Sequence, residues 1–215
     1  ASKRNITLEQ LFSHTSGIPY EEDACLSNSQ YTLATCANRI LQRPLIGTPG
    51  KVFAYGGNSM QVAGRMAEIA TGKAWDDIFI AEMVTPLRLS ATDYATASTS
   101  PNYQRNTNAR IAGGVRSTQE DYGKIVDMVL AYGCLDSGFP NNCLPGRRFL
   151  SRATIDLMAR DRTVGTIDIA RPPTSPGYGY GIGLWIDPSS PLILSSPGAF
   201  GFTPWVDRTT QVAGI

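Results

Sequence analysis

The sequence lacks an excess of charge of either sign. Its 215 residues include 19 Lys and Arg against 18 Asp and Glu, which gives a formal net charge of +1. A nucleic-acid-binding protein normally carries a basic stripe that displaces counterions from phosphates. This chain contains neither a run of Lys and Arg nor aromatic residues interleaved with one. A nucleic acid is therefore not an expected partner.

Long apolar runs are also missing. No run approaches the roughly 18 residues that a membrane-spanning helix needs, so we expect no membrane span. Hydrophobic residues make up 42% of the chain and charged residues 17%, with 21 Gly and 14 Pro. This composition is typical of a globular, loop-rich protein with a buried core, and it argues against disorder or a coiled coil.

Metal-binding patterns are absent from the sequence. The 4 cysteines form no Cys-x-x-Cys motif and His14 is the single histidine, so we predict neither a metal nor a cofactor. The cysteines form two local pairs, Cys25 with Cys36 and Cys134 with Cys143. This spacing predicts two disulfides, with unpaired reduced thiols as the alternative. Loop-closing disulfides persist mainly in oxidising compartments, which favours a secreted or periplasmic location.

Helical signals dominate the first three quarters of the chain. Thr7 with Gln10, and Ser117 with Glu120, have the spacing of a capping box. Apolar residues at helical spacing, ended by Gly or Pro, predict further helices. The predicted helices cover residues of about 7–16, 30–42, 58–71, 75–84 (ended by Pro86), 117–133 and 151–160.

The pattern changes after Gly165. Large and small residues alternate from Tyr178 to Asp187 as they do in strands, and short strands are expected at residues 192–195 and 203–206. We therefore predict a mainly helical subdomain at residues 1–165 and strands of an α/β subdomain at residues 166–215. The chain stops at Ile215 inside an apparent strand. We expect a sheet that is incomplete without further N-terminal and C-terminal segments.

Four separated segments resemble the serine β-lactamase and penicillin-binding-protein family, in its class C and family VIII esterase branch. The segments are Ile6 to Pro19 with the turn His14-Thr15-Ser16-Gly17, Pro49 to Tyr55 followed by Val62 to Gly72, Ala112 to Asp121, and Gly177 to Gly183. They occur in the family's order over nearly the whole chain. The resemblance implies an α+β, β-lactamase/transpeptidase-like fold, with a helical subdomain and part of an antiparallel sheet.

The same resemblance implies acyl transfer to a serine and then to water, with a small ester or a lactam or other amide as substrate. Tyr55 occupies the position of the family tyrosine that belongs to the general-base apparatus. A phenol has a pKa near ~10 and becomes an effective base only beside a cation. The structural alternative is a core tyrosine beside Phe53. Asn58 lies one residue after the position of the family asparagine, so it is a candidate for substrate binding or for capping the helix that follows.

Ser196-Pro197-Gly198 corresponds to the family's third motif, which is Lys-Thr-Gly or His-x-Gly. Ser196 and Gly198 are therefore candidate substrate-binding residues, and the N–H of Ala199 is a candidate oxyanion donor, since this role needs no particular side chain. A glycine-rich turn is the structural alternative. Because the motif's cation is absent, a neutral ester is favoured over a carboxylate-bearing lactam.

The family's Ser-x-x-Lys nucleophile motif is missing from this sequence. No lysine has a serine three positions before it, and Thr48-Pro49-Gly50-Lys51 is the nearest imitation. His14 is a poor candidate for a Ser-His-Asp triad, because no Gly-x-Ser-x-Gly elbow accompanies it, and we expect a hydrogen-bonded turn residue instead. Two hypotheses remain. The nucleophile lies on a missing N-terminal segment or a second chain, or the protein is a catalytically inactive binding module.

Overall fold

A computed structural model describes residues 3–94, 106–135, 143–172 and 176–215. These residues form two compact units. The first comprises Ala1–Met83, Thr92–Arg116 and Gly165–Pro176, and the second comprises Val84–Ala91, Ser117–Val164 and Gly177–Ile215. The expected boundary at residue 165 differs from this division, because the helices after residue 117 belong with the sheet and a strand after Gly165 belongs with the first unit.

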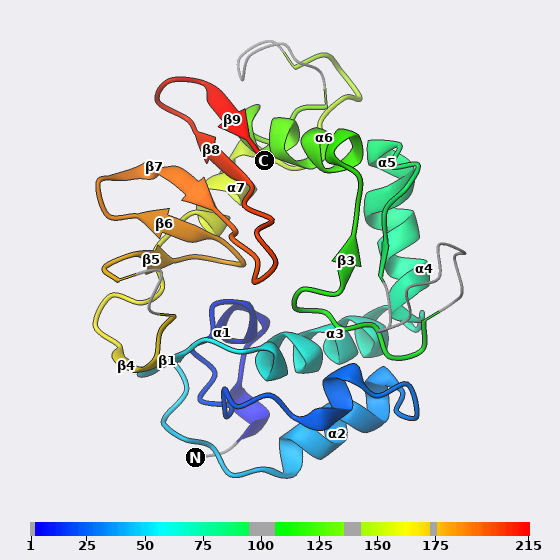
Figure 1. The fold of residues 1–215 in the computed structure, drawn as a ribbon, viewed down its shortest axis with the longest axis vertical. Helices are drawn as coiled ribbons and strands as arrows, with labels where there is room; N and C mark the ends of the chain where they lie inside the picture. Colours follow the sequence, from blue (N-terminus) through cyan, green and yellow to red (C-terminus); the bar gives the residue numbers. More distant parts are fainter. Residues whose placement is uncertain (1–2, 95–105, 136–142, 173–175) are drawn as a thin grey trace. The chain divides into compact units, whose positions relative to one another are not determined.

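The first unit is mainly helical, as Figure 1 shows. Its helices and helical turns are η1 (Lys3–Asn5), α1 (Leu8–Phe12), η2 (Ala24–Ser27), α2 (Leu33–Gln42), α3 (Gly57–Thr71), α4 (Trp75–Phe79) and the greater part of η3 (Ile80–Val84). Its strands are β1 (Val52–Ala54), β2 (Asp93–Tyr94), β3 (Val115–Arg116) and β4 (Ile167–Ala170). Strands β1 and β4 pair in parallel, and β2 pairs antiparallel with β3.

Local sequence signals explain where these helices begin and end. The capping box of Thr7 and Gln10 is formed at α1, and Thr32 caps α2 through Thr35. Gly72 ends α3 in the left-handed conformation, with φ of 70°, as its place after the apolar pattern predicts. The helix expected to stop before Pro86 instead continues through η3 into α5 (Thr85–Leu87). Proline is tolerated there because it stands in the first turn of α5.

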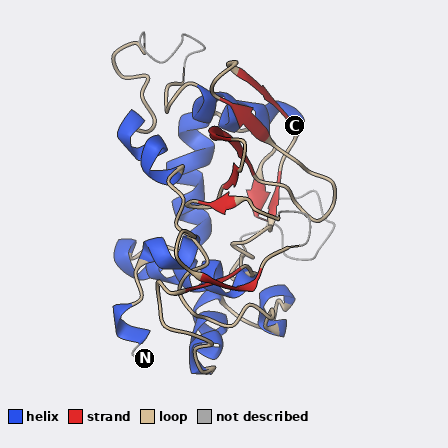
Figure 2. Ribbon diagram, turned by 90° about the vertical axis from the view of Figure 1, so that its left-hand side faces the viewer, coloured by secondary structure: helices blue, strands red, loops and turns tan. Residues whose placement is uncertain are grey.

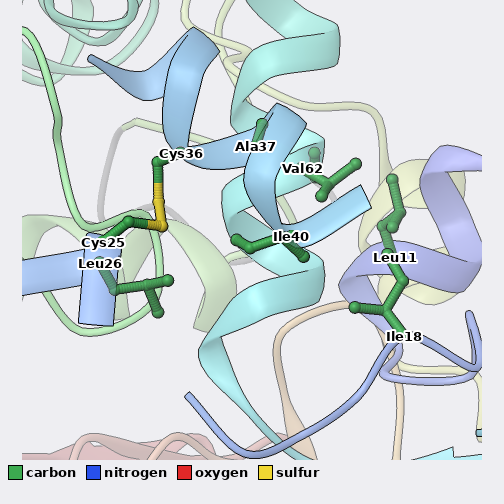
Figure 3. Close-up of a cluster of buried hydrophobic side chains, with 9 residues drawn as sticks. Leu11, Ile18, Cys25, Leu26, Cys36, Ala37, Ile40 and Val62 are labelled. Atoms are coloured by element: carbon green, nitrogen blue, oxygen red, sulfur yellow. A yellow bond between two sulfur atoms is a disulfide. The ribbon is translucent and has the colours of Figure 1, made fainter. Parts of the chain in front are cut away.

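The core of the first unit lies where α1 and α2 pack on α3. Figure 3 shows the cluster, with the Cys25–Cys36 disulfide at one side and Leu11 and Ile18 at the other. Its buried members are Leu11, Ile18, Cys25, Leu26, Cys36, Ala37, Ile40, Val62 and Ala63. This apolar contact fixes the start of α3, and with it the end of β1 that precedes α3.

The second unit is built on a five-stranded antiparallel sheet. Its strands are β5 (Gly179–Tyr180), β6 (Trp185–Asp187), β7 (Ser190–Ser195), β8 (Trp205–Asp207) and β9 (Val212–Gly214), paired in chain order. The remaining helices are α6 (Gln119–Leu130) and α7 (Arg152–Met158). In Figure 2 the strands appear in red and the helices in blue.

Helix α6 packs against β8 and β9. Val126 on its apolar face belongs to a buried cluster that also contains Ile186, Leu194 and Val206 of the sheet. The strands that the sequence predicts at 192–195 and 203–206 are confirmed by β7 and β8, whereas the run 178–187 forms two short antiparallel strands, β5 and β6, instead of one. Among the described residues, no helix combines the length and apolarity that crossing a membrane would require.

Both predicted disulfides are present. Cys25 bonds to Cys36 and Cys134 bonds to Cys143, across sequence separations of 11 and 9 residues. The first joins η2 to α2 inside the core cluster, and both of its cysteines are buried. The second closes a loop whose residues 136–142 lie outside the described residues.

We predict that replacing Cys25 and Cys36 together by alanine lowers the free energy of unfolding by about 3 kcal/mol or more. Opening a loop of this length accounts for roughly 3 kcal/mol, and lost packing in the cluster adds to it. The Cys134→Ala/Cys143→Ala double variant is the matched control and should lose less. Urea unfolding measures both, and an equal or reversed order would contradict this assignment of the core disulfide.

Candidate active site

Tyr55 follows β1 directly, and two backbone hydrogen bonds hold the strand end there. The N–H of Ala54 donates to the carbonyl of His14 at 3.0 Å, and the N–H of Tyr55 donates to the carbonyl of Ala170 at 2.9 Å. The residues of β1 are all buried, whereas Tyr55 is half-buried. The strand thus delivers the tyrosine from the core of the first unit to its surface.

The ring of His14 lies against Tyr55. The two ring centroids are 4.5 Å apart, and the ring planes are tilted by 56°. His14 also forms an edge-on pair with Phe53, in which the ring centroids are 6.3 Å apart. Only 2% of His14 is exposed. Removal from water disfavours the charged imidazolium and lowers the pKa of His14 to about 3. At neutral pH the side chain is therefore an uncharged imidazole, too weak a base for a catalytic triad and consistent with the expected turn residue.

The backbone conformation and contacts of the turn at residues 14–17 fix the position of His14. His14 has a φ of 57°, a left-handed conformation in which His occurs more often than most residues. Gly17 has a φ of 73°, and a side chain on it would collide with the carbonyl oxygen of Gly47. The hydroxyl of Ser16 is 2.8 Å from that of Ser59, which ties the turn to α3.

Arg171 lies over the face of the Phe53 ring. Its guanidinium carbon is 4.5 Å from the centroid of the Phe53 ring, and its Nε and Nη2 atoms donate to the two carboxylate oxygens of Asp168 at 2.9 Å each. Sequence reasoning missed Arg171. The only available signal was its spacing of three residues from Asp168, because the parallel pairing that places β4 beside β1 is not visible locally.

Asn58 is fully buried, in contrast to the expectation that it binds substrate. Its Oδ1 accepts from the N–H of Asp23 at 3.0 Å, and its Nδ2 donates to the carbonyls of Pro19 and Glu21 at 2.8 and 2.9 Å. Its alternative role as a helix cap is not found either, since Gly56 is the N-cap of α3 and no side chain caps it. Asn58 instead fastens the segment 19–23 to the start of α3.

Ser196, Gly198 and Ala199 lie in the loop that joins β7 to β8 in the second unit. The N–H of Ser196 donates to the carbonyl of Pro204 at 3.0 Å, and that of Gly198 donates to the carbonyl of Phe202 at 2.6 Å. Gly198 is thus committed to the turn. Ala199 is exposed, and its N–H is not used in the hydrogen bonds of the described residues. Ala199 therefore remains the candidate oxyanion donor of this loop.

An apolar groove lies beside this loop. Its volume is about 350 Å³ including space open to solvent, and its exposed lining is almost entirely apolar. The described residues that line it are uncharged: Tyr122, Ile125, Val126, Val129, Leu184, Leu194, Ser195, Ser196, Pro204, Trp205 and Val206. At the tip of the loop Phe200 is 99% exposed. The ring of Phe202 packs on that of Tyr122, with 4.6 Å between the ring centroids. No group of three or more potential metal ligands occurs among the described residues.

We predict that the first unit becomes less stable as the pH is lowered, because His14 is buried in its uncharged form. Between about pH 6.5 and 3 the unfolded chain binds a proton at His14 that the folded chain does not, so stability is present above this range and decreases as pH falls. At about 1.36 kcal/mol per pH unit, the free energy of unfolding should drop by about 2 kcal/mol from pH 7.5 to pH 5. Carboxylates with lowered pKa, such as Asp23 and Asp207, lose their contribution only below their ordinary value of 3.8.

The control for this prediction is His14→Asn, which suits the left-handed conformation and does not titrate in this range. Urea unfolding of both proteins at the two pH values measures the effect. The prediction is wrong if the wild-type chain is equally stable at both pH values. It is also wrong if the free energy of unfolding of His14→Asn drops by as much as that of the wild-type chain.

We also predict that Asn58→Ala lowers the free energy of unfolding by about 2 to 4 kcal/mol, because it leaves an N–H and two carbonyls of segment 19–23 without their partner. Asn5→Ala, at an exposed position, should change it by less than about 0.5 kcal/mol. Chemical denaturation measures both. A nearly neutral Asn58→Ala would show that the amide does not hold this segment.

Comparison with known proteins agrees with the geometry. The Beta-lactamase family model matches residues 1–215. Over 86 residues, or 40% of this chain and 23% of the relative, the sequence is 30% identical to penicillin-binding protein 4 of Amycolatopsis lactamdurans. A solved candidate β-lactamase from Bacteroides dorei is 29% identical with a TM-score of 0.75, covering 97% of this chain. EstCE1, described as a hydrolase with promiscuous acyltransferase activity, shares the fold at 18% identity, 97% coverage and a TM-score of 0.73.

The chain spans less than two thirds of the length of these proteins, with 62% of the Bacteroides dorei chain and 65% of the EstCE1 chain covered. The mixed helix and sheet architecture, the order of the motifs and the family match along the whole sequence agree with one another. The resemblance read from the sequence is thus confirmed, and the chain belongs to the beta-lactamase family, with a β-lactamase/transpeptidase-like fold.

Proposed function

We propose that this chain is the larger part of an extracytoplasmic serine hydrolase that transfers the acyl group of a small ester to a serine and then to water. The observation that carries the proposal is the placement of Tyr55. Its family position coincides with the end of a buried strand, where backbone bonds to His14 and Ala170 hold it while the side chain remains partly exposed. The two disulfides support an oxidising compartment.

In the proposed reaction, the serine oxygen attacks the ester carbonyl as Tyr55 Oη accepts the serine proton. The N–H of Ala199 donates to the oxyanion that develops, the alcohol leaves with the proton, and water then releases the acid by the same route. The nucleophile itself would come from a Ser-x-x-Lys motif outside these 215 residues, on a preceding segment or a second chain. The lysine of that motif would also supply the cation that stabilises a phenolate at Tyr55.

An ester is favoured over a carboxylate-bearing lactam because of Ser196. The family places a lysine or histidine at this position, and a serine offers no positive charge to a substrate carboxylate. The uncharged lining of the groove beside Ser196 supports the same preference. An amide or lactam substrate is the second candidate within this reaction class.

The competing proposal is a binding module that has the fold and lacks the nucleophile. The polypeptide encoded upstream of Ala1 separates the two, because a Ser-x-x-Lys motif a few dozen residues before Ile6 is required for the enzyme. An upstream segment without that motif would favour the binding module.

We predict that the complete protein hydrolyses p-nitrophenyl acetate and forms a covalent adduct with a fluorophosphonate, whereas these 215 residues alone do neither. Tyr55→Phe in the complete protein should lower kcat by about 10²-fold or more, as expected for loss of a general base. Tyr31→Phe removes a phenol elsewhere in the first unit and serves as the matched control. Mass spectrometry and steady-state kinetics supply the measurements, and full activity in Tyr55→Phe would rule out the assigned role.

We further predict that Ser196→Lys in the complete protein shifts selectivity toward anionic substrates. Its ratio of kcat/KM for benzylpenicillin to that for p-nitrophenyl acetate should rise at least about tenfold, equivalent to 1.4 kcal/mol, because the ammonium attracts the penicillin carboxylate. Ser189→Lys adds the same charge at an exposed turn and should leave the ratio nearly unchanged. An unchanged ratio in Ser196→Lys would argue against Ser196 as the determinant of charge preference.

A further inference from the structure

His14 contacts the segment 54–56 at three points. Its carbonyl accepts from the N–H of Ala54 at 3.0 Å, its ring nitrogen Nδ1 accepts from the N–H of Gly56 at 3.5 Å, and its ring lies 4.5 Å from that of Tyr55. Backbone bonds thus fix the residues on either side of Tyr55, while the ring contact restricts Tyr55 itself. One residue, far away in sequence, controls both the backbone and the side chain at this position.

The His14 ring is itself held firmly. The turn that carries it is tied to neighbouring elements, because the N–H of Thr15 donates to the carbonyl of Gln10 at 2.9 Å and the N–H of Gly50 donates to the carbonyl of Thr15 at 2.7 Å. The ring also lies edge-on to Phe53, with 6.3 Å between the ring centroids, and Phe53 is fully buried and carries the Arg171 guanidinium on its face. A ring supported in this way is a rigid surface for Tyr55.

The charge state of the His14 ring also bears on Tyr55. Because Nδ1 accepts a hydrogen bond, the ring proton resides on Nε2. Burial keeps the imidazole uncharged at neutral pH. An uncharged ring leaves the proton affinity of the phenol to be set by other groups, and it does not compete for the proton that Tyr55 is proposed to accept.

We propose that His14 is a positioning residue for Tyr55, fixing the rotamer of the tyrosine ring by direct contact and the adjacent backbone through its carbonyl and Nδ1. The inference rests on the proposed function, in which Tyr55 acts in acyl transfer. A base must lie within about 2.6–3.2 Å of the atom whose proton it takes, and a displacement of about 1 Å can cost about 10²-fold in rate. Loss of the His14 ring should therefore lower kcat without weakening substrate binding.

The first arm of the test uses the 215-residue chain labelled with ¹³C-tyrosine, with the Tyr55 signal identified by its loss in Tyr55→Phe. His14→Asn keeps a hydrogen-bond acceptor and a residue type that tolerates positive φ, and it removes the ring. We expect the Tyr55 ring signal in this variant to move toward that of a solvent-exposed tyrosine. His14→Phe keeps a ring beside Tyr55 and loses the acceptor, so the signal should move less.

Phe79→Leu is the matched control, because it removes an aromatic neighbour from another tyrosine of the same unit. Phe79 and Tyr94 have ring centroids 4.8 Å apart. This variant should lose stability in urea unfolding without moving the Tyr55 signal. A Tyr55 signal that stays unchanged in His14→Asn, while the variant remains folded, would overturn the proposal and leave the proposed function standing.

The second arm measures kinetics in the complete protein. His14→Asn should lower kcat for p-nitrophenyl acetate by about tenfold or more with KM nearly unchanged, whereas Phe79→Leu should leave both unchanged. Unchanged kcat in His14→Asn would overturn the positioning role. If the wild-type complete protein shows no hydrolysis and no covalent adduct, the proposed function fails, and the Tyr55 signal alone then decides whether His14 positions this ring.

Discussion

The bond between the carbonyl of His14 and the N–H of Ala54, together with the bond between Tyr55 and Ala170, places the end of β1. Three segments that are distant in sequence meet there: the turn after α1, the strand before α3 and the strand β4. Because all residues of β1 are buried, the strand cannot shift without exposing apolar surface. The position of Tyr55 is therefore a consequence of core packing in the first unit.

Several polar groups are buried in this arrangement, and their hydrogen bonds offset the free-energy cost of removing them from water. Asn58 uses its amide to hold segment 19–23, and His14 remains uncharged because its ring is removed from water. A buried amide with its bonds satisfied gives specificity to a loop that has little apolar surface of its own. In the second unit, backbone hydrogen bonds close the loop from Ser196 to Pro204, and Ala199 in this loop is exposed.

Local patterns predicted a large part of this structure. The Thr7 and Gln10 pair, Gly72 after an apolar helix and the two cysteine pairs each act over at most 11 residues of sequence, so local sequence is enough to predict them. The pairing of β1 with β4 depends on residues far apart in the chain, and its strands are too short to show alternation. The burial of Asn58 and the stacking of Arg171 on Phe53 were hidden for the same reason. The continuation of the helix past Val84 was missed because the first turn of a helix has no need of the proline N–H.

Under the proposed function, Tyr55 is held where it can exchange a proton with a serine nucleophile. The most direct measurement is a crystal structure of the complete protein after reaction with a fluorophosphonate. We expect Tyr55 Oη to lie within about 3.2 Å of the Oγ atom of the modified serine, with the N–H of Ala199 donating to the phosphonyl oxygen. A modified serine beyond hydrogen-bonding reach of Tyr55, or modification of a different residue type, would contradict the role proposed for Tyr55.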